Sequence, residues 1–292
     1  MDLKKFKLIS AVFLAGALLF LSVILIVNKN QADNMPFSVA EDLSALFASQ
    51  GIELSPDIIP LTRERLAVYS CRAADGAEAQ KIAETAGKST RLAANLTDDG
   101  YLFRLENGAM IEVSRFREIR FNQNNALDAP SYPASQPNDA ARERADAFIS
   151  RFSPDSDDSD DVFCTYRLTE YATDGGNTLL RFNIFINGVK IEGDSLSVCQ
   201  SESEEVLRAY GKCVFSPLEK ESGFKYYDII NILKKEYDRI SESGTPGDRL
   251  KSVELCYLMR YSADKEKILF LPGWKIEYSN GAMRFYESVR IE

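Results

Sequence analysis

Three Asn-Gly dipeptides constrain the fold of this 292-residue chain more than any other local feature. They lie at Asn107–Gly108, Asn187–Gly188 and Asn280–Gly281. A type I′ turn needs positive φ at both central residues, and Asn-Gly adopts it readily. Apolar residues alternate with other residues before the second and third turns, and Asp99–Gly100 and Gly175–Gly176 mark two further hairpins. The chain therefore favours antiparallel strand pairs.

Helices are predicted by start and stop signals around apolar residues at helical spacing. In the longest helix these residues include Ile230, Leu233 and Tyr237. The four expected helices run from Ser38-x-x-Glu41, a capping box, to Gly51; from Asp75-x-x-Glu78 to Gly87; over about 138–152; and over about 223–240.

The order of these elements predicts an α+β fold with repetition. After one N-terminal transmembrane helix, units of a helix packed on an antiparallel β-sheet are expected to recur. The last unit is expected to hold strands near 252–261, 267–271, 273–279 and 283–291. The expected divisions are a cytoplasmic tail at 1–7, a transmembrane helix at 8–27, a membrane-proximal α+β domain at 28–121, a polar, proline-bearing linker at 122–137, and a C-terminal α+β domain at 138–292 made of units 138–215 and 223–292.

The segment Leu8–Val27 predicts membrane attachment. It runs 20 residues without a charge, which as a helix spans about 30 Å, the thickness of the hydrocarbon core. Lys4, Lys5 and Lys7 precede it, so the N-terminus is expected in the cytoplasm and the rest of the chain outside. A cleaved signal peptide is the alternative, but its apolar core would be shorter and followed by a cleavage site.

The net charge divides unevenly about this segment. The whole chain carries −9, and residues 1–29 carry four Lys and one Asp, a sum of +3. The remaining residues therefore carry −9 − 3 = −12. A domain this acidic is repelled by anionic headgroups and does not suit a nucleic-acid surface, which needs clustered Lys and Arg.

The chain has no histidine, which excludes Ser-His-Asp and Cys-His nucleophiles and His-ligated metals. Gly193-Asp194-Ser195-Leu196 matches an esterase nucleophile motif whose base is a histidine, so a structural role is expected for it. Ser222-x-x-Lys225 and Ser262-x-x-Lys265 match a Ser-Lys spacing but have no Lys-Thr-Gly partner. We expect no enzyme activity, no cofactor and no small-molecule substrate.

Three other features leave alternatives open. The acidic run Asp155–Asp161 lacks the Gly and Glu of an EF-hand loop, so a solvated loop is favoured over a weak calcium site, and no metal site is predicted. The lone Trp274 is expected in the core rather than stacked on a ligand. The five cysteines fit either one or two disulfides or buried thiols.

Within the apolar segment, Ala11, Ala15, Leu18 and Ser22 share one helical face. Small residues allow a second helix to approach closely, and Ser22 adds a hydrogen-bonding group. This face is the predicted contact for a partner helix. The alternative is that the whole helix faces lipid and its small residues have no partner.

The assembly resembles the YycI/YycH proteins, accessory regulators of the WalK–WalR two-component system in Gram-positive bacteria. The resemblance rests on the short Lys-bearing start MDLKKFK, the single span, and the stretches Leu46–Pro60, Phe185–Val198 and Leu271–Gly281. The helix followed by a Pro-Gly-Trp-Lys-Ile strand and a hairpin is also similar to PepSY-type units.

The resemblance implies a membrane-anchored extracytoplasmic regulator in cell-wall homeostasis. Such a protein modulates a sensor histidine kinase by contact, together with a paralogous membrane regulator, and brings no catalytic residues. The PepSY likeness implies an alternative, a protease-binding or inhibitory module at the cell surface.

Overall fold

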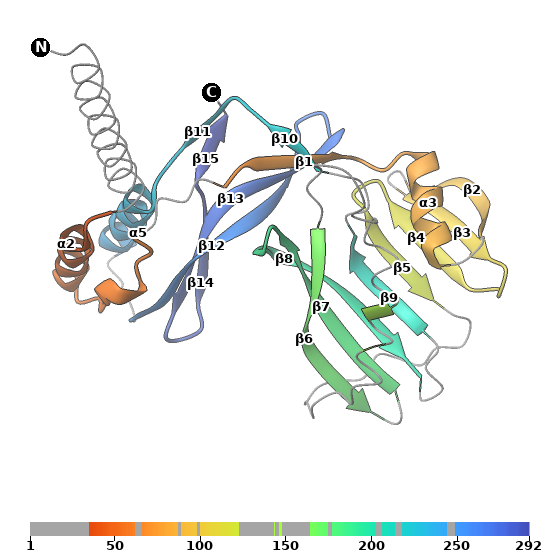
Figure 1. Ribbon diagram of the computed structural model, residues 1–292, viewed down its shortest axis with the longest axis horizontal. Helices are drawn as coiled ribbons and strands as arrows, with labels where there is room; N and C mark the ends of the chain where they lie inside the picture. Colours follow the sequence, from red (N-terminus) through yellow and green to blue (C-terminus); the bar gives the residue numbers. More distant parts are fainter. Residues whose placement is uncertain are drawn as a thin grey trace, which may run out of the picture. The chain divides into compact units, whose positions relative to one another are not determined.

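The computed structural model describes only part of the chain. Within that part it contains three α-helices, one 3-10 turn and fifteen strands (Figure 1). The described residues are 35–61, 66–86, 89–97, 100–122, 143, 146, 147, 164–174, 177–201, 206–213, 218–243 and 249–291.

The helices are α2 (Phe37–Ala48), α3 (Gly76–Ala86) and α5 (Ile229–Ser243), with a 3-10 turn, η1, at Pro56–Ile58. The strands are β1 (Val68–Arg72), β2 (Ser89–Thr97), β3 (Gly100–Leu105), β4 (Met110–Ser114), β5 (Glu118–Asn122), β6 (Cys164–Asp174), β7 (Asn177–Ile186), β8 (Val189–Gln200), β9 (Val206–Lys212), β10 (Glu219–Glu221), β11 (Phe224–Tyr226), β12 (Leu250–Tyr261), β13 (Lys267–Tyr278), β14 (Met283–Glu287) and β15 (Val289–Ile291).

The predicted repetition of helix-plus-sheet units is wrong. The described residues form a large mixed sheet with the order β10-β1-β13-β12-β8-β9-β5-β4-β3-β2, to which β6, β7 and β14 add. Strands far apart in sequence pair within it: β12 lies parallel to β8 through Tyr257↔Ile191, and β1 lies antiparallel to β13. Such long-range pairing joins segments that local signals had assigned to separate units.

The predicted transmembrane helix is not part of the described fold either, because Leu8–Val27 lies outside the described residues. Among the residues that are described, no helix has the length and apolar character needed to cross a bilayer.

The chain divides into two compact units, each built from three segments. Unit 1 comprises 1–66, 226–254 and 274–288, and unit 2 comprises 67–225, 255–273 and 289–292. The predicted domains were contiguous stretches of chain, whereas β12 and β13 each run from one unit into the other. The predicted division into strands near 267–271 and 273–279 is wrong, because β13 is continuous from Lys267 to Tyr278.

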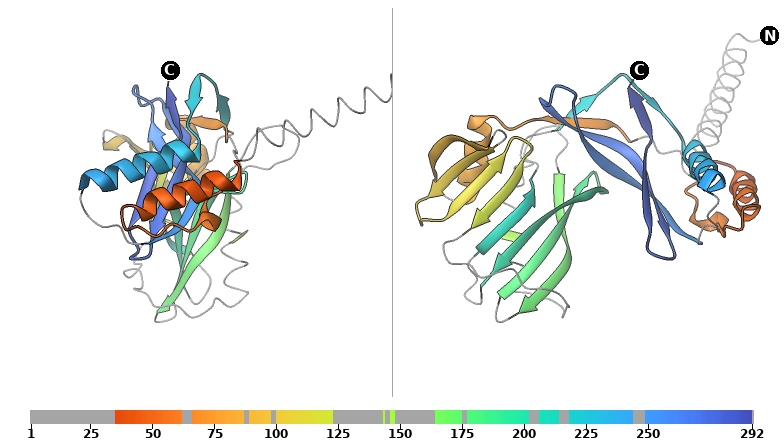
Figure 2. Two further views of the ribbon diagram at one scale, coloured as in Figure 1. Left: turned by 90° about the vertical axis from the view of Figure 1, so that its left-hand side faces the viewer. Right: turned by 180° about the vertical axis from the view of Figure 1, so that it is seen from behind.

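Unit 1 contains helices α2 and α5, strand β14, and the parts of β12 and β13 at 250–254 and 274–278. Helices α2 and α5 lie side by side (Figure 2), with the rings of Phe47 and Tyr237 edge to face at 5.8 Å. Strands β12, β13 and β14 follow one another through the turns at 262–266 and 279–282. Trp274 is 4% exposed, so the prediction that it packs in the core is confirmed.

The helix starts in unit 1 differ from the predicted ones. Helix α2 begins at Phe37 with Pro36 at the N-cap and no side-chain cap, so the Ser38-x-x-Glu41 box is wrong. The expected stop is present, since Gly51 has φ of +73°. Helix α5 begins at Ile229 rather than at 223, because the residues before it form β11, which pairs with β15.

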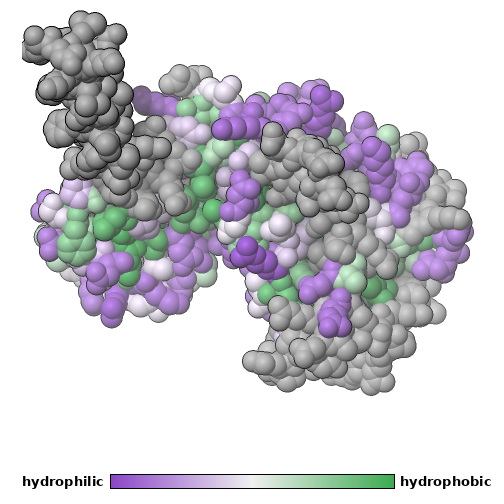
Figure 3. Space-filling model, in the orientation of Figure 1, coloured by the Kyte–Doolittle hydropathy of each residue, from purple (hydrophilic) through white to green (hydrophobic). Residues whose placement is uncertain are grey.

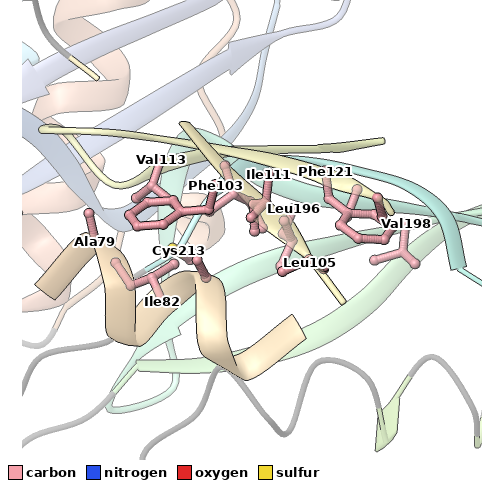
Figure 4. Packing of buried hydrophobic residues seen from close by; sticks show 14 of the residues in the cluster. Ala79, Ile82, Phe103, Leu105, Ile111, Val113, Phe121, Leu196, Val198 and Cys213 are labelled. Atoms are coloured by element: carbon pink, nitrogen blue, oxygen red, sulfur yellow. The ribbon is translucent and has the colours of Figure 1, made fainter. Parts of the chain in front are cut away.

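Unit 2 has its core between α3 and one face of the sheet. Ala79 and Ile82 on the helix point toward Phe103 and Val113 on the strands (Figure 4). On the inner face of α3, Ala79, Ile82 and Ala83 are fully buried. The predicted alternation in β7 is also confirmed, because the side chains at 180, 182, 184 and 186 are fully buried.

The Asn-Gly turns show how far local chemistry determines the backbone. Asn187 (φ 49°) and Gly188 (φ 82°) both have positive φ and join β7 to β8 with Ile186 opposite Val189. Gly108 and Gly281 also have positive φ, but the asparagines before them do not. Those two sites are longer turns in which Asn107 and Asn280 accept backbone hydrogen bonds from Ala109 and Ala282.

Asp75 provides a direct test of helix capping. Its Oδ1 accepts hydrogen bonds from the backbone N–H groups of Ala77 and Glu78, each at 2.9 Å. Asp75→Ala is expected to lower the free energy of unfolding of unit 2 by about 1 kcal/mol, because two helix-end donors lose their acceptor. Urea unfolding followed by circular dichroism measures the change. Asp75→Asn keeps an acceptor and serves as the matched control; an equal loss in both variants would contradict the capping role.

All five cysteines are buried free thiols. Burial raises the pKa of Cys71 to about 11 and that of Cys213 to about 12. The Sγ of Cys213 donates to the carbonyl of Arg117 at 3.4 Å. Of the two alternatives that the sequence left open, the structure has the buried thiols, which are little ionised and so unreactive.

Candidate functional site

Several residues singled out in the sequence lie outside the described residues. These are the membrane face Ala11, Ala15, Leu18 and Ser22 and the acidic run Asp155–Asp161. Within the described part of the chain, no three Cys, Asp or Glu side chains gather in a way that could hold a metal ion.

The Ser-Lys pairs lie in turns and exposed connections. Ser262 donates to Asp264 at 2.5 Å and accepts from the backbone N–H of Lys267 at 2.9 Å, so its hydroxyl closes the β12–β13 turn. Lys265 in that turn has φ of 58° and is exposed. Ser222 and Lys225 are exposed at the start of β11.

The Gly193-Asp194-Ser195-Leu196 fragment lies within strand β8. Burial raises the pKa of the Asp194 carboxyl, and the nearby Lys212 ammonium partly offsets this. Lys212 donates to the Tyr261 hydroxyl at 2.6 Å and forms an ion pair with Glu118 at 3.0 Å. These contacts join β9 to β12 and β5, so the cluster has a structural role in the sheet.

The feature best suited to contact with another molecule is β14, in unit 1. It pairs with β13 and, among the described residues, with no other strand. Edge strands carry unpaired N–H and C=O groups that can pair with another chain. We call Met283–Glu287, with this open side, the β14 edge.

One face of the β14 edge is fixed to helix α5. The hydroxyls of Tyr286 in β14 and Tyr278 in β13 both donate to the carboxylate of Glu236, which is fully buried. Arg239 completes the set with two hydrogen bonds to the same carboxylate, at 2.6 and 3.0 Å. The strand is thereby held in place from the helix side.

The hydrogen bonds to the Glu236 carboxylate favour its ionised form. Burial raises the pKa of Glu236, but hydrogen bonds from Arg239, Tyr278 and Tyr286 outweigh it, and the pKa lies below its usual range. Burial and the same carboxylate raise the pKa of Tyr286 to about 12. Both tyrosines therefore stay protonated and donate.

The other face of the β14 edge presents apolar side chains to solvent. Met283 is 48% exposed and Phe285 is 44% exposed. They are two residues apart in a strand and so point to the same side, opposite to Tyr286. Arg284 between them is exposed and forms no ion pair within the described part of the chain. The face of unit 1 visible in Figure 3 likewise mixes apolar with hydrophilic residues.

The β14 edge was not identified from the sequence. One strand was predicted over 283–291, where the structure has two, β14 and β15, and the sequence does not show which strand borders a sheet. Alternation of Met283 and Phe285 with Arg284 and Tyr286 was the available signal, and it fits an internal strand equally well.

No family model matches this chain, and no curated protein matches it.

Proposed function

We propose that this chain is a membrane-anchored extracytoplasmic regulator that modulates a sensor histidine kinase of a two-component system by protein contact, in cell-wall homeostasis. The observation that carries the proposal is the β14 edge. Single exposed apolar residues are ordinary, but Met283 and Phe285 lie together on a strand whose outer side is open to pairing. An apolar surface on a strand that pairs on one side only is suited to binding a protein.

The location rests on the sequence. The uncharged segment Leu8–Val27, with lysines before it, is suited to holding the chain at a membrane with its N-terminus inside. The −12 charge of the remaining residues keeps them off anionic headgroups and available to a neighbouring protein. The kinase as partner, and a paralogous regulator beside it, rest on the resemblance to the YycI/YycH proteins.

A test is to cross-link the full chain in its own membranes and identify what it captures. Capture of a sensor histidine kinase, with altered phosphorylation of its response regulator when the chain is deleted, supports the proposal. Capture of an extracellular protease without any kinase would replace it with the PepSY-like role. Capture of neither, with unchanged phosphorylation, would contradict both.

The membrane face gives a sharper prediction. Ala15→Ile is expected to reduce kinase capture roughly tenfold while leaving membrane insertion intact, because a bulky side chain prevents close approach of a second helix. Ala17→Ile is the matched control, since a 3.6-residue period places Ala17 away from the Ala11/Ala15/Leu18/Ser22 face. Equal capture by the two variants would exclude this face as the contact. A membrane two-hybrid assay measures the difference.

A further inference from the structure

We propose that the β14 edge binds an extended segment of the partner kinase as an added β-strand, and that this segment carries a carboxylate between two apolar residues. This inference rests on the proposed function and names how the contact is made. Main-chain hydrogen bonds would supply affinity, and alternate side chains would supply specificity.

The backbone of β14 is suited to strand addition because it is both open and fixed. Its inner side pairs with β13, and no second strand of the described residues pairs with its outer side. Tyr286 is hydrogen-bonded to the buried carboxylate of Glu236 on α5. An edge that is already ordered pays little conformational entropy when it binds, which favours association.

The composition of β14 does little to prevent pairing. Natural edge strands are protected by Pro, by Lys, by bulges or by charged residues that point inward. The sequence Met-Arg-Phe-Tyr-Glu contains no Pro and no Lys; Arg284 and Glu287 are its charged residues, and its central residue, Phe285, is exposed and apolar. The exposed apolar pair on this edge is therefore available to a second strand.

The side chains indicate the partner's pattern. Residues opposite Met283 and Phe285 would share their face, so apolar residues are expected there. The residue between them would lie opposite Arg284, which is exposed and has no ion pair within the described part of unit 1. A Glu or Asp at that position would form a cross-strand pair with Arg284.

Charge also favours a different protein over a second copy of this chain. Two copies would each bring −12 outside the membrane and repel one another. Antiparallel self-pairing centred on Phe285 would place Arg284 opposite Tyr286 of the second copy, and no carboxylate would face it. The occupant is therefore assigned as a segment of the partner.

The test uses the full chain in membranes with the captured kinase. Arg284→Glu and Phe285→Asp are each expected to reduce kinase capture roughly tenfold, because a cross-strand attraction becomes a repulsion or an apolar contact is lost. Arg284→Lys should retain capture. Lys220→Glu, at an exposed position in unit 2, is the matched charge-reversal control and should bind normally. Unchanged thermal unfolding establishes that the exposed substitutions leave the fold intact.

Two further measurements separate strand addition from other contacts. A photo-cross-linking phenylalanine analogue at position 285 should capture the kinase, while the same analogue at the exposed Tyr210 should not. Amides of β14 should exchange more slowly in the complex than in the free chain, because the added strand accepts their hydrogen bonds.

The outcomes are distinguishable. Strand addition would be overturned if every β14 variant still captured the kinase, the analogue at position 285 formed no cross-link, and hydrogen exchange of the β14 amides did not change. The proposed function would then still stand. Cross-linking of two copies of this chain through 285 would assign the edge to self-association instead. Failure of the unaltered chain to capture any kinase would overturn the proposed function and this inference together.

Discussion

Replacing Glu236 with alanine is expected to lower the free energy of unfolding of unit 1 by about 3 kcal/mol. The carboxylate is fully buried and accepts hydrogen bonds from Arg239, Tyr278 and Tyr286. Its removal leaves the buried Tyr278 hydroxyl and the partly buried Tyr286 hydroxyl without their acceptor, and Arg239 without its counter-ion. The Arg239 side chain is 39% exposed, so water solvates part of its unpaired charge. The expected destabilisation is therefore at the lower end of the range for a broken buried ion pair.

Urea unfolding followed by the fluorescence of Trp274 measures this loss, since the only tryptophan lies in the core of the same unit. Asp238→Ala, at an exposed position two residues along the same helix, is the matched control and should change stability little. A loss no larger than that of the control would show that the Glu236 cluster does not stabilise unit 1.

The free energy of unfolding of unit 1 is expected to fall at acidic pH. The pKa of Glu236 is lowered on folding, so its contribution is fully present above the unfolded value near 4.5 and is lost as pH falls through the folded value. Glu236→Gln cannot ionise. The stability advantage of the unaltered chain over this variant should therefore be constant near neutral pH and shrink below about pH 4.5. If the stability difference between the two chains stayed constant on acidification, Glu236 would not be ionised in the folded chain.

Gly211→Ala is expected to destabilise unit 2 by about 3 kcal/mol. Gly211 has φ of +133°, which side-chain-bearing residues rarely adopt, and an added Cβ would lie 2.0 Å from the carbonyl oxygen of Ser195 and 2.9 Å from the Cα of Leu196. Both neighbours are backbone atoms of β8, so relief requires β8 and β9 to separate. That separation would break the pairing of Leu196 with Gly211.

Gly193→Ala isolates the backbone strain from the clash. Gly193 has φ of +82° but nothing within 4 Å of an added Cβ, so a loss of only about 1 kcal/mol is expected. Hydrogen exchange of the β8 and β9 amides measures both variants. Equal losses at the two positions would show that the contact with Ser195 is not what requires glycine at 211.

Helix α5 shows where sequence reasoning reached its limit. The apolar spacing that predicted this helix includes Leu233, which is fully buried, and Tyr237, which is only partly buried, and it gives no sign that Glu236 is fully buried. A charged residue at a helix position is ordinarily a solvent-facing one. Glu236 is buried because Arg239 follows one turn later and tyrosines from β13 and β14 meet it, and neither strand can be assigned to that position from the helix sequence.

What the sequence alone determined about this protein is local. The Asn187–Gly188 turn, the alternation in β7 and the Asp75 cap each depend on residues within a few positions of one another, where backbone preference and side-chain period act directly. Tertiary structure alone decided the mixed sheet and its open edge. The parallel pairing of β12 with β8 and the position of β14 at the border follow from burial shared between distant segments, which short-range signals do not encode.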